Sequence, residues 1–268
     1  MKSTIEKDNQ AFAELDAEGV FDDRGKLQDF QKMIDRTLFC ASSGIVAPRS
    51  AQWRGGRVYL EKSGGTLFMA ASNNIRLGFT SRKVGDFFPD FEGIIVPPEV
   101  LQKIAGRKRG SAPLNISIVD KKARFHIGSN CVSAELLSGD FHKFYRDRRE
   151  LPGIFPLAFS ADRSALLKSL GAISPAIDRY SALSLTLSPE VLTLQTGDEE
   201  CSAEDDVPCD YAGAQTTLIF HAKSFTEIIE HIDTDRVTVR FNSEKLTVAV
   251  LPEPERDNLF FIAQRKRG

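Results

Sequence analysis

The stretch GDFHKFYRDRRELPGIFP, residues 139–156, separates two halves of the chain in which the same order of elements is predicted. It is basic, aromatic and punctuated by prolines, as connections between domains commonly are. Working outward from it, we predict one domain at 25–152 and a second at 153–268. Residues 1–24 precede them as a polar segment that forms a leading strand or stays mobile.

The recurrence is clearest in two stretches of alternating apolar residues around a polar turn. Residues 115–127 read NISIVDKKARFHI, and residues 236–250 read RVTVRFNSEKLTVAV. This alternation predicts an antiparallel hairpin in each half. Equivalent apolar positions are expected at one constant offset without a gap, placing Ile116, Ile118, Phe125 and Ile127 on Val237, Val239, Leu246 and Val248.

Other predicted elements recur in the same order. Two further hairpins are expected at 57–71 (RVYLEKSGGTLFMAA) and 182–196 (ALSLTLSPEVLTLQT). The remaining predictions are helices at 27–39 and 162–173, the latter capped by Ser160, strands at 94–96 and 218–220, and helices at 98–104 and 222–232. Each half therefore spans about 120 residues, an ordinary domain size. The order favours a duplication over two unrelated α+β domains.

Composition limits the class of protein. The chain is 41% hydrophobic and 27% charged, and its net charge is −2, so any nucleic-acid surface must be local. Its four cysteines show no CxxC and no metal-ligand spacing, which predicts reduced thiols in a cytoplasmic protein. The N-terminus lacks the apolar core of a signal peptide, and no apolar run approaches the roughly 20 residues of a membrane span.

The sequence contains no recognisable catalytic, phosphate-binding or metal-binding motif. There is no phosphate loop, GxGxxG or GxSxG. The helix ending at His231 has Glu227 where a zinc helix needs its first histidine. An acidic loop is predicted at 198–206 (DEECSAEDD), where carboxylates either bind a metal or are simply solvated. We therefore expect a binding protein, with no catalytic residues, metal or cofactor.

Residues 71–77, ASNNIRL, resemble ATDGHRL of the bacterial sliding clamps, the β subunit of DNA polymerase III. Residues 94–104, IIVPPEVLQKI, resemble the following strand and helix of that family's middle domain. Residues 136–152 resemble its closing segment, in which Phe-Pro-Asp-Tyr leads to Arg-Arg-Val-Leu-Pro; here FHKF stands at 141–144 and RRELP at 148–152. The second half resembles the family's last domain in hydrophobic order and spacing.

The resemblance implies an α+β fold of two tandem clamp-like domains, each with two helices packed on curved antiparallel sheet. It implies a processivity factor that encircles or binds duplex DNA and tethers a polymerase, a clamp loader or other DNA-processing partners. The family has three domains per subunit, and the first looks missing here. Two-domain subunits would complete a six-domain ring as a homotrimer.

Site residues follow by position. Cations on or beside the predicted helices are either solvated or in contact with phosphate, and they are Lys32, Arg36, Lys103, Arg107, Lys108, Arg109, Lys168 and Lys223. A pocket for partner peptides is implied between the two domains, and its expected residues are Trp53, Ser72, Asn74, Arg76, Leu77, Phe141, His142, Phe144 and Phe261.

Departures from the family leave three alternatives open. A basic ending, QRKRG at 264–268, replaces the family's apolar Met-Pro-Met-Arg-Leu, and the last helix carries Glu227 and Glu230. The first alternative is a clamp-like interaction module that forms no ring. The second is an enzyme on an unrelated fold that uses Asp205 and Asp206, and the third is a fragment of a longer clamp.

Overall fold

The computed structural model describes residues 27–41, 56–73, 75–84, 90–108, 112–139, 141, 151–177, 182–197, 201–254 and 258–265. The first half contains α2 (Leu27–Thr37), the short 3-10 helix η1 (Leu38–Ala41), β1 (Arg57–Ser63), β2 (Thr66–Ser72), β3 (Arg76–Lys83), β4 (Phe91–Val96), α3 (Pro98–Ala105), β5 (Leu114–Val119), β6 (Lys122–Ile127) and β7 (Asn130–Glu135).

The second half repeats this order behind one additional strand. It contains α4 (Leu151–Ile154), β8 (Leu157–Asp162), α5 (Arg163–Ile173), η3 (Ser174–Ala176), β9 (Ala182–Ser188), β10 (Val191–Gly197), β11 (Ser202–Asp210), β12 (Thr216–His221), α6 (Ala222–Glu230), β13 (Arg236–Phe241), β14 (Thr247–Glu253) and β15 (Asn258–Ala263). Each half therefore runs helix, four strands, helix, three strands.

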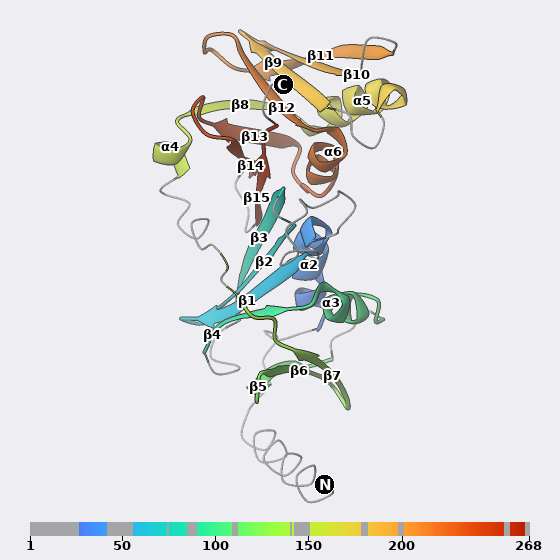
Figure 1. Ribbon diagram of the computed structural model, residues 1–268, viewed down its shortest axis with the longest axis vertical. Helices are drawn as coiled ribbons and strands as arrows, with labels where there is room; N and C mark the ends of the chain where they lie inside the picture. Colours follow the sequence, from blue (N-terminus) through green and yellow to red (C-terminus); the bar gives the residue numbers. More distant parts are fainter. Residues whose placement is uncertain are drawn as a thin grey trace, which may run out of the picture.

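One sheet passes from the second half into the first. Its strand order is β12-β9-β10-β11-β8-β13-β14-β15-β3-β2-β1-β4, and β5-β6-β7 form a separate sheet. The two halves meet where β15 pairs with β3, with Asn258 opposite Thr80 and Ile262 opposite Arg76. Figure 1 shows α2, α3, α5 and α6 along one side of the molecule, with the strands of the long sheet beside them.

Tight turns explain why the hairpins form where the sequence predicts them. Gly64 and Gly65, between β1 and β2, have φ of 54° and 70°, the backbone that a two-residue hairpin turn requires. Asp120 and Lys121, between β5 and β6, adopt the same region with φ of 51° and 61°. These hairpins are confirmed as β1–β2 and β5–β6.

Apolar residues are buried on both faces of the long sheet. The larger core packs between the helices and the sheets. A second group, the outer cluster, covers the opposite face around the strands β3 and β15. Its buried members are Tyr59, Ala70, Leu77, Phe79, Ile95, Phe155, Ala249, Leu251, Leu259 and Phe261. The outer cluster lies over the strand pair that joins the two halves.

Two local predictions are wrong. The predicted acidic loop at 198–206 lies largely in β11, because residues from Ser202 onward pair with β10. Asp162, rather than Ser160, caps α5, and its carboxylate accepts the Ala165 N–H at 2.7 Å. Ser160 belongs to β8, where its hydroxyl lies 2.8 Å from that of Thr238.

The gapless alignment of the last hairpins is also wrong in its second strand. Ile118 pairs with Ala123 across a tight turn, whereas Val239 pairs with Val250 across a longer one. Leu246 therefore lies outside β14, with 50% of its surface exposed. In the described part of the chain, no helix is long and apolar enough to cross a membrane.

Candidate nucleic-acid and partner interface

Lysines predicted to meet phosphate are exposed on the helices. Lys32 lies on α2, Lys103 on α3, Lys168 on α5 and Lys223 on α6. Lys32 Nζ is 3.9 Å from a carboxylate oxygen of Asp29, a distance that leaves it largely solvated. The four helices that carry these lysines lie along the same side of the molecule (Figure 1).

The other predicted cations differ in their surroundings. Arg36 Nη2 lies 2.8 Å from Asp233 Oδ2, so this guanidinium already joins α2 to the segment after α6. Arg107 is half-buried and Lys108 is exposed, both directly after α3, while Arg109 lies outside the described residues. The contact of Arg36 could not be predicted from the sequence, because Asp233 is 197 positions away.

Each pair of helices is held by one side chain. Gln31 Nε2 on α2 donates to the carbonyl oxygens of Ile104 and Arg107 at the end of α3, both at 3.0 Å. Arg163 at the start of α5 donates to the carbonyl oxygens of Ile229 and Glu230 at the end of α6, both at 2.9 Å. Carbonyls at a helix end have no partner within the helix, so these contacts fix the paired helices.

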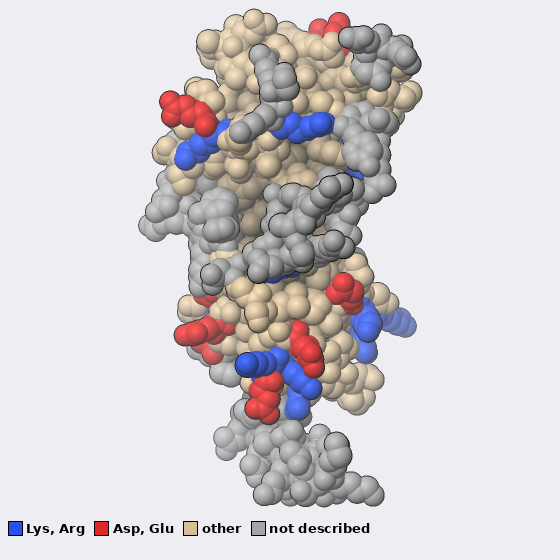
Figure 2. All heavy atoms as spheres, viewed as in Figure 1, with Lys and Arg blue, Asp and Glu red and all other residues tan. Residues whose placement is uncertain are grey.

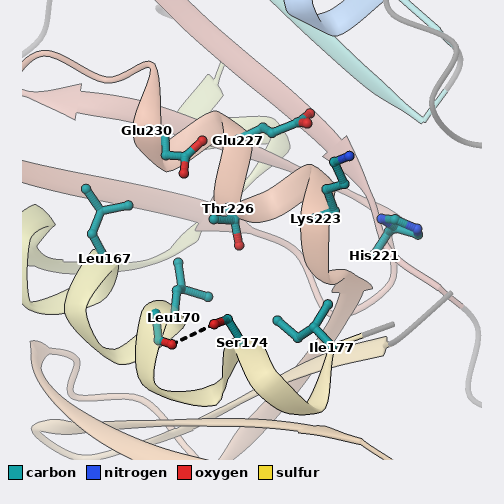
Figure 3. A pocket seen from close by; sticks show the side chains of 10 residues that line it. Leu167, Leu170, Ser174, Ile177, His221, Lys223, Thr226, Glu227 and Glu230 are labelled. Carbon is teal, nitrogen blue, oxygen red and sulfur yellow. Dashed lines mark hydrogen bonds between the residues drawn. The ribbon is translucent and has the colours of Figure 1, made fainter. Parts of the chain in front are cut away.

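A groove of about 990 Å³ lies between α5 and α6. Leu167, Leu170 and Ile177 form its apolar side, and Lys223, Glu227 and Glu230 project from α6 (Figure 3). Two carboxylates and one ammonium group therefore surround it, so this part of the helix side is not basic. Figure 2 shows acidic and basic side chains interspersed over the visible face of the first half.

Arg76 points into the junction between the halves. Its side chain is 3% exposed and is bonded through Nη1 to the carboxylate of Glu227 on α6. Its Nη2 donates to the carbonyl oxygen of Phe39 at 2.6 Å, and the guanidinium lies 5.2 Å from the centre of that ring. Phe39 also stacks on His231, with ring centres 3.7 Å apart. Arg76 thus links β3, η1 and α6.

The described residues of the implied peptide pocket lie near one another, but Leu77 and Phe261 are buried rather than lining an open pocket. Leu77 is opposite Phe261 across the β3–β15 pair, and both are buried. The Ser72 hydroxyl donates to the Arg76 carbonyl at 3.0 Å, and half-buried Phe141 stacks on Tyr59 with centres 5.3 Å apart. The remaining predicted pocket residues fall outside the described ranges, and they are Trp53, Asn74, His142 and Phe144.

Among the described residues there is no group of three or more His, Cys, Asp or Glu placed to hold a metal ion. The carboxylates of Asp205 and Asp206 lie on β11, where Asp206 accepts a hydrogen bond from Thr193 at 2.6 Å. Burial raises the pKa of the Cys40 thiol, which lies beside Arg76 and Glu227. A buried protonated thiol is a poor nucleophile.

Comparisons with known proteins agree with this architecture. Residues 157–253 match the family "DNA polymerase III beta subunit, N-terminal domain". A curated relative, the beta sliding clamp of Pseudomonas aeruginosa strain PAO1, is 22% identical over 251 residues, which are 88% of this chain and 63% of the relative. The chain therefore spans less than two thirds of that relative's length.

Solved structures give the same fold. A crystal structure of the DNA polymerase III subunit beta from P. aeruginosa has a TM-score of 0.78 at 21% identity, covering 94% of this chain and 69% of that one. Another structure of the sliding clamp from P. aeruginosa, bound to griselimycin, has a TM-score of 0.74 at 20% identity, covering 90% and 64%. The predicted clamp fold of tandem helices on antiparallel sheet is confirmed.

The family match bears on which domain each half resembles. The matched model describes an N-terminal domain, whereas the hydrophobic order and spacing of the same half resemble the family's last domain. The correspondence of each half to one domain of the longer relatives therefore stays a prediction, as do the boundaries at 25–152 and 153–268.

Proposed function

Because this chain is a relative of the bacterial sliding clamps and has their fold, we propose that it is a clamp-type processivity factor. It would hold duplex DNA along the side formed by α2, α3, α5 and α6 and tether a polymerase or another DNA-processing partner. Such a role requires a surface and a shape rather than catalytic chemistry.

The observation that carries the proposal is the continuous sheet through the β3–β15 pair. This pairing fixes the two halves side by side, so that their helices share one side of the molecule (Figure 1). A double helix is long and uniformly charged, and it needs such an extended surface with cations spaced along it. The exposed lysines at positions 32, 103, 168 and 223 supply cations in both halves.

Contact through these lysines is weak by itself. Each phosphate neutralised contributes about −0.9 to the slope of log K against log salt, so a few lysines give affinity that falls away at high salt. They contact phosphates rather than bases, so binding would be independent of sequence. Retention on DNA would then depend on closure around it, which we propose is by a homotrimer of two-domain subunits.

We propose the outer cluster beside Leu77 and Phe261 as the site for partner peptides. These residues are buried, and Phe155 and Phe141 pack against the same cluster. A peptide would therefore enter by displacing side chains of the connection between the halves. Arg76 would act indirectly, because its guanidinium is bonded to Glu227 and faces the helix side.

Retention on closed circular DNA, compared with the same DNA cut once, tests the proposal. A protein that encircles the duplex stays on the circle at moderate salt and slides off the ends of the linear form. We expect this difference after loading by a clamp loader. Equal loss from both forms would contradict encirclement, while absence of salt-sensitive binding to either form would contradict the DNA surface itself.

A second candidate function is a clamp-like interaction module that forms no ring. The exposed carboxylate of Glu230 on α6 favours it, since this residue lines the groove beside Lys223, one of the proposed DNA contacts. The solution mass separates the two candidates. A species near 89 kDa, three times the 29.7 kDa of the chain, supports the ring, and a monomer at all concentrations supports the module.

A further inference from the structure

The Glu227 carboxylate on α6 has two cations as possible partners. One is buried Arg76 of β3, whose guanidinium is bonded to it. The other is exposed Lys223, which precedes Glu227 by four positions, so the two side chains are neighbours one turn apart on α6. Both line the groove between α5 and α6 (Figure 3). The Glu227 side chain is 27% exposed, so it can turn toward Lys223 once Arg76 no longer holds it.

The position of Arg76 depends on the closed partner site. Leu77 follows Arg76 in β3 and faces the outer cluster, where it lies opposite Phe261 of β15. Consecutive residues share a planar peptide unit, so a displacement of Leu77 also displaces Arg76. On the helix side, Arg76 donates to the carbonyl oxygen of Phe39, and that ring lies 5.7 Å from the ring of Phe260 on β15. Both faces of the β3–β15 pair therefore bear on the same guanidinium.

Other contacts keep α6 in place when Arg76 moves. Arg36 of α2 is bonded to Asp233, just after α6, at 2.8 Å. The His231 ring stacks on Phe39 with centres 3.7 Å apart, and its Nδ1 donates to the Glu227 carbonyl oxygen at 2.7 Å. These contacts do not involve the Glu227 carboxylate. The element with two positions is therefore a single side chain on a helix that stays fixed.

We propose that Glu227 couples the partner site to the DNA side of the molecule. A partner peptide that enters beside Leu77 displaces β3 and withdraws Arg76 from Glu227. The freed carboxylate then pairs with Lys223, which is one of the proposed DNA contacts, and this pairing removes one cation from the phosphates. Peptide and duplex DNA therefore weaken each other's binding. The inference rests on the proposed function, because it connects the two surfaces that the function uses.

The size of the coupling follows from the loss of one cation. A cation that no longer meets a phosphate reduces the slope of log K against log salt by about 0.9. We expect the affinity for DNA at low salt to fall by about fivefold, and linkage requires DNA to lower the affinity for the peptide by the same factor. Partner binding would thus loosen the hold on the phosphates, which favours sliding.

Cys40 reports the opening of the junction without any DNA. Its thiol is fully buried beside Arg76 and Glu227, and a Cβ atom at Gly78 of β3 would come within 3.0 Å of its sulfur. A shift of β3 that withdraws Arg76 therefore exposes this thiol. We expect Leu77→Ala, which removes the outer contact of β3, to raise the rate of Cys40 alkylation by iodoacetamide severalfold, as measured by mass spectrometry.

A second leucine variant separates this opening from a general loss of stability. Leu192 on β10 is fully buried in the larger core, so Leu192→Ala also deletes buried apolar surface. At a temperature where both variants are folded, Leu192→Ala should leave the alkylation rate of Cys40 close to that of the unchanged protein. An equal acceleration in both variants, or none in Leu77→Ala, overturns the inference.

The second test measures DNA affinity by anisotropy of a labelled duplex over a salt series. Leu77→Ala should weaken binding about fivefold and reduce the salt slope by about 0.9. Adding Glu227→Gln should remove both effects, because no carboxylate is left at that position to pair with Lys223. Glu230→Gln removes an exposed carboxylate from the same groove and should leave the effects of Leu77→Ala in place.

A polymerase-derived peptide provides the direct comparison, since saturating peptide should reproduce the effects of Leu77→Ala on the unchanged protein. A peptide that binds without changing DNA affinity overturns the coupling, and so does an effect of Leu77→Ala that persists in the Glu227→Gln background. Absence of salt-sensitive DNA binding by the unchanged protein would instead count against the proposed function. In that case the alkylation of Cys40 still decides whether the junction opens.

Discussion

Arg76 and Leu77, consecutive residues of β3, hold the two halves together from opposite faces of one sheet. The Arg76 guanidinium is bonded to Glu227 on α6, 151 positions later in the chain. Leu77 faces the other way and lies opposite Phe261 of β15 in the outer cluster. Alternation along a strand sends successive side chains to opposite faces, so two neighbours make both contacts.

Breaking the Arg76–Glu227 ion pair should lower the free energy of unfolding more when the buried Arg76 guanidinium remains than when the Glu227 carboxylate remains. Glu227→Gln leaves a guanidinium that is 3% exposed without its carboxylate, and we expect a loss of about 2–3 kcal/mol in unfolding free energy. Arg76→Met leaves Glu227, which is 27% exposed and can turn to water, so the loss should be smaller. Denaturant titration measures both, and the reverse order would contradict the structure.

Lysines on the helices should govern the salt dependence of DNA binding. We expect Lys168→Glu on α5 to weaken binding to duplexes of any sequence and to reduce the salt slope by about 1. Lys245→Glu makes the same change of charge in the exposed turn between β13 and β14 and should leave the slope unaltered. Fluorescence anisotropy over a salt series compares them, and equal effects would argue against a DNA surface on the helices.

Leu77→Ala should weaken binding of a polymerase-derived peptide, because it removes apolar surface at the proposed site. Its control is Leu192→Ala on β10, a buried leucine of the larger core, away from the proposed site. Both variants should lose about 2–4 kcal/mol of stability, as buried leucines commonly do. A titration at a temperature where both variants are folded should show weaker peptide binding for Leu77→Ala alone. Equal peptide affinities of the two variants would contradict the proposed site.

Thiol reactivity should follow burial. Burial raises the pKa of Cys40, and burial with the nearby Asp210 carboxylate raises that of Cys209, so both have less thiolate at neutral pH. Cys131 and Cys201 are exposed and should be alkylated first. Mass spectrometry of the native protein over time measures the order. Modification of Cys40 before Cys131 would show that the junction around Arg76 opens readily.

The cap of α5 should make stability sensitive to acid. Hydrogen bonds from Ser164 and the Ala165 N–H lower the pKa of the Asp162 carboxyl in the folded protein. A carboxyl with a lowered folded pKa contributes stability above its unfolded value of about 3.9, and the contribution is lost as pH falls through the folded value. Asp162→Ala should therefore lower the unfolding midpoint at neutral pH and have less effect at the acidic limit; Asp162→Asn, which keeps a capping oxygen, is the control.

Predictions from alternating patterns were the most successful. The strands of β1–β2, β5–β6 and β9–β10 were predicted because each alternates around a short turn. Strand β11 was missed because its carboxylates at Glu204, Asp205 and Asp206 hide the alternation of Val207 and Cys209. An edge strand tolerates charges that a central strand does not, so its sequence resembles that of a loop.

Site residues were predicted less evenly. The exposed lysines lie on the predicted helices, because an amphipathic helix that is apolar on one face carries its cations on the opposite face. The role of Arg36 could not be predicted, because its partner Asp233 belongs to the other half. The groove between α5 and α6 also depends on side chains from two helices far apart in sequence.

The repeated order of helices and strands can be predicted from the sequence, because hydrophobic periodicity and turn chemistry act over a few neighbouring residues. The pairing of β15 with β3 and the ion pair between Arg76 and Glu227 are visible only in the tertiary structure. Those contacts join residues more than a hundred positions apart, and they form only when packing has brought the two halves together.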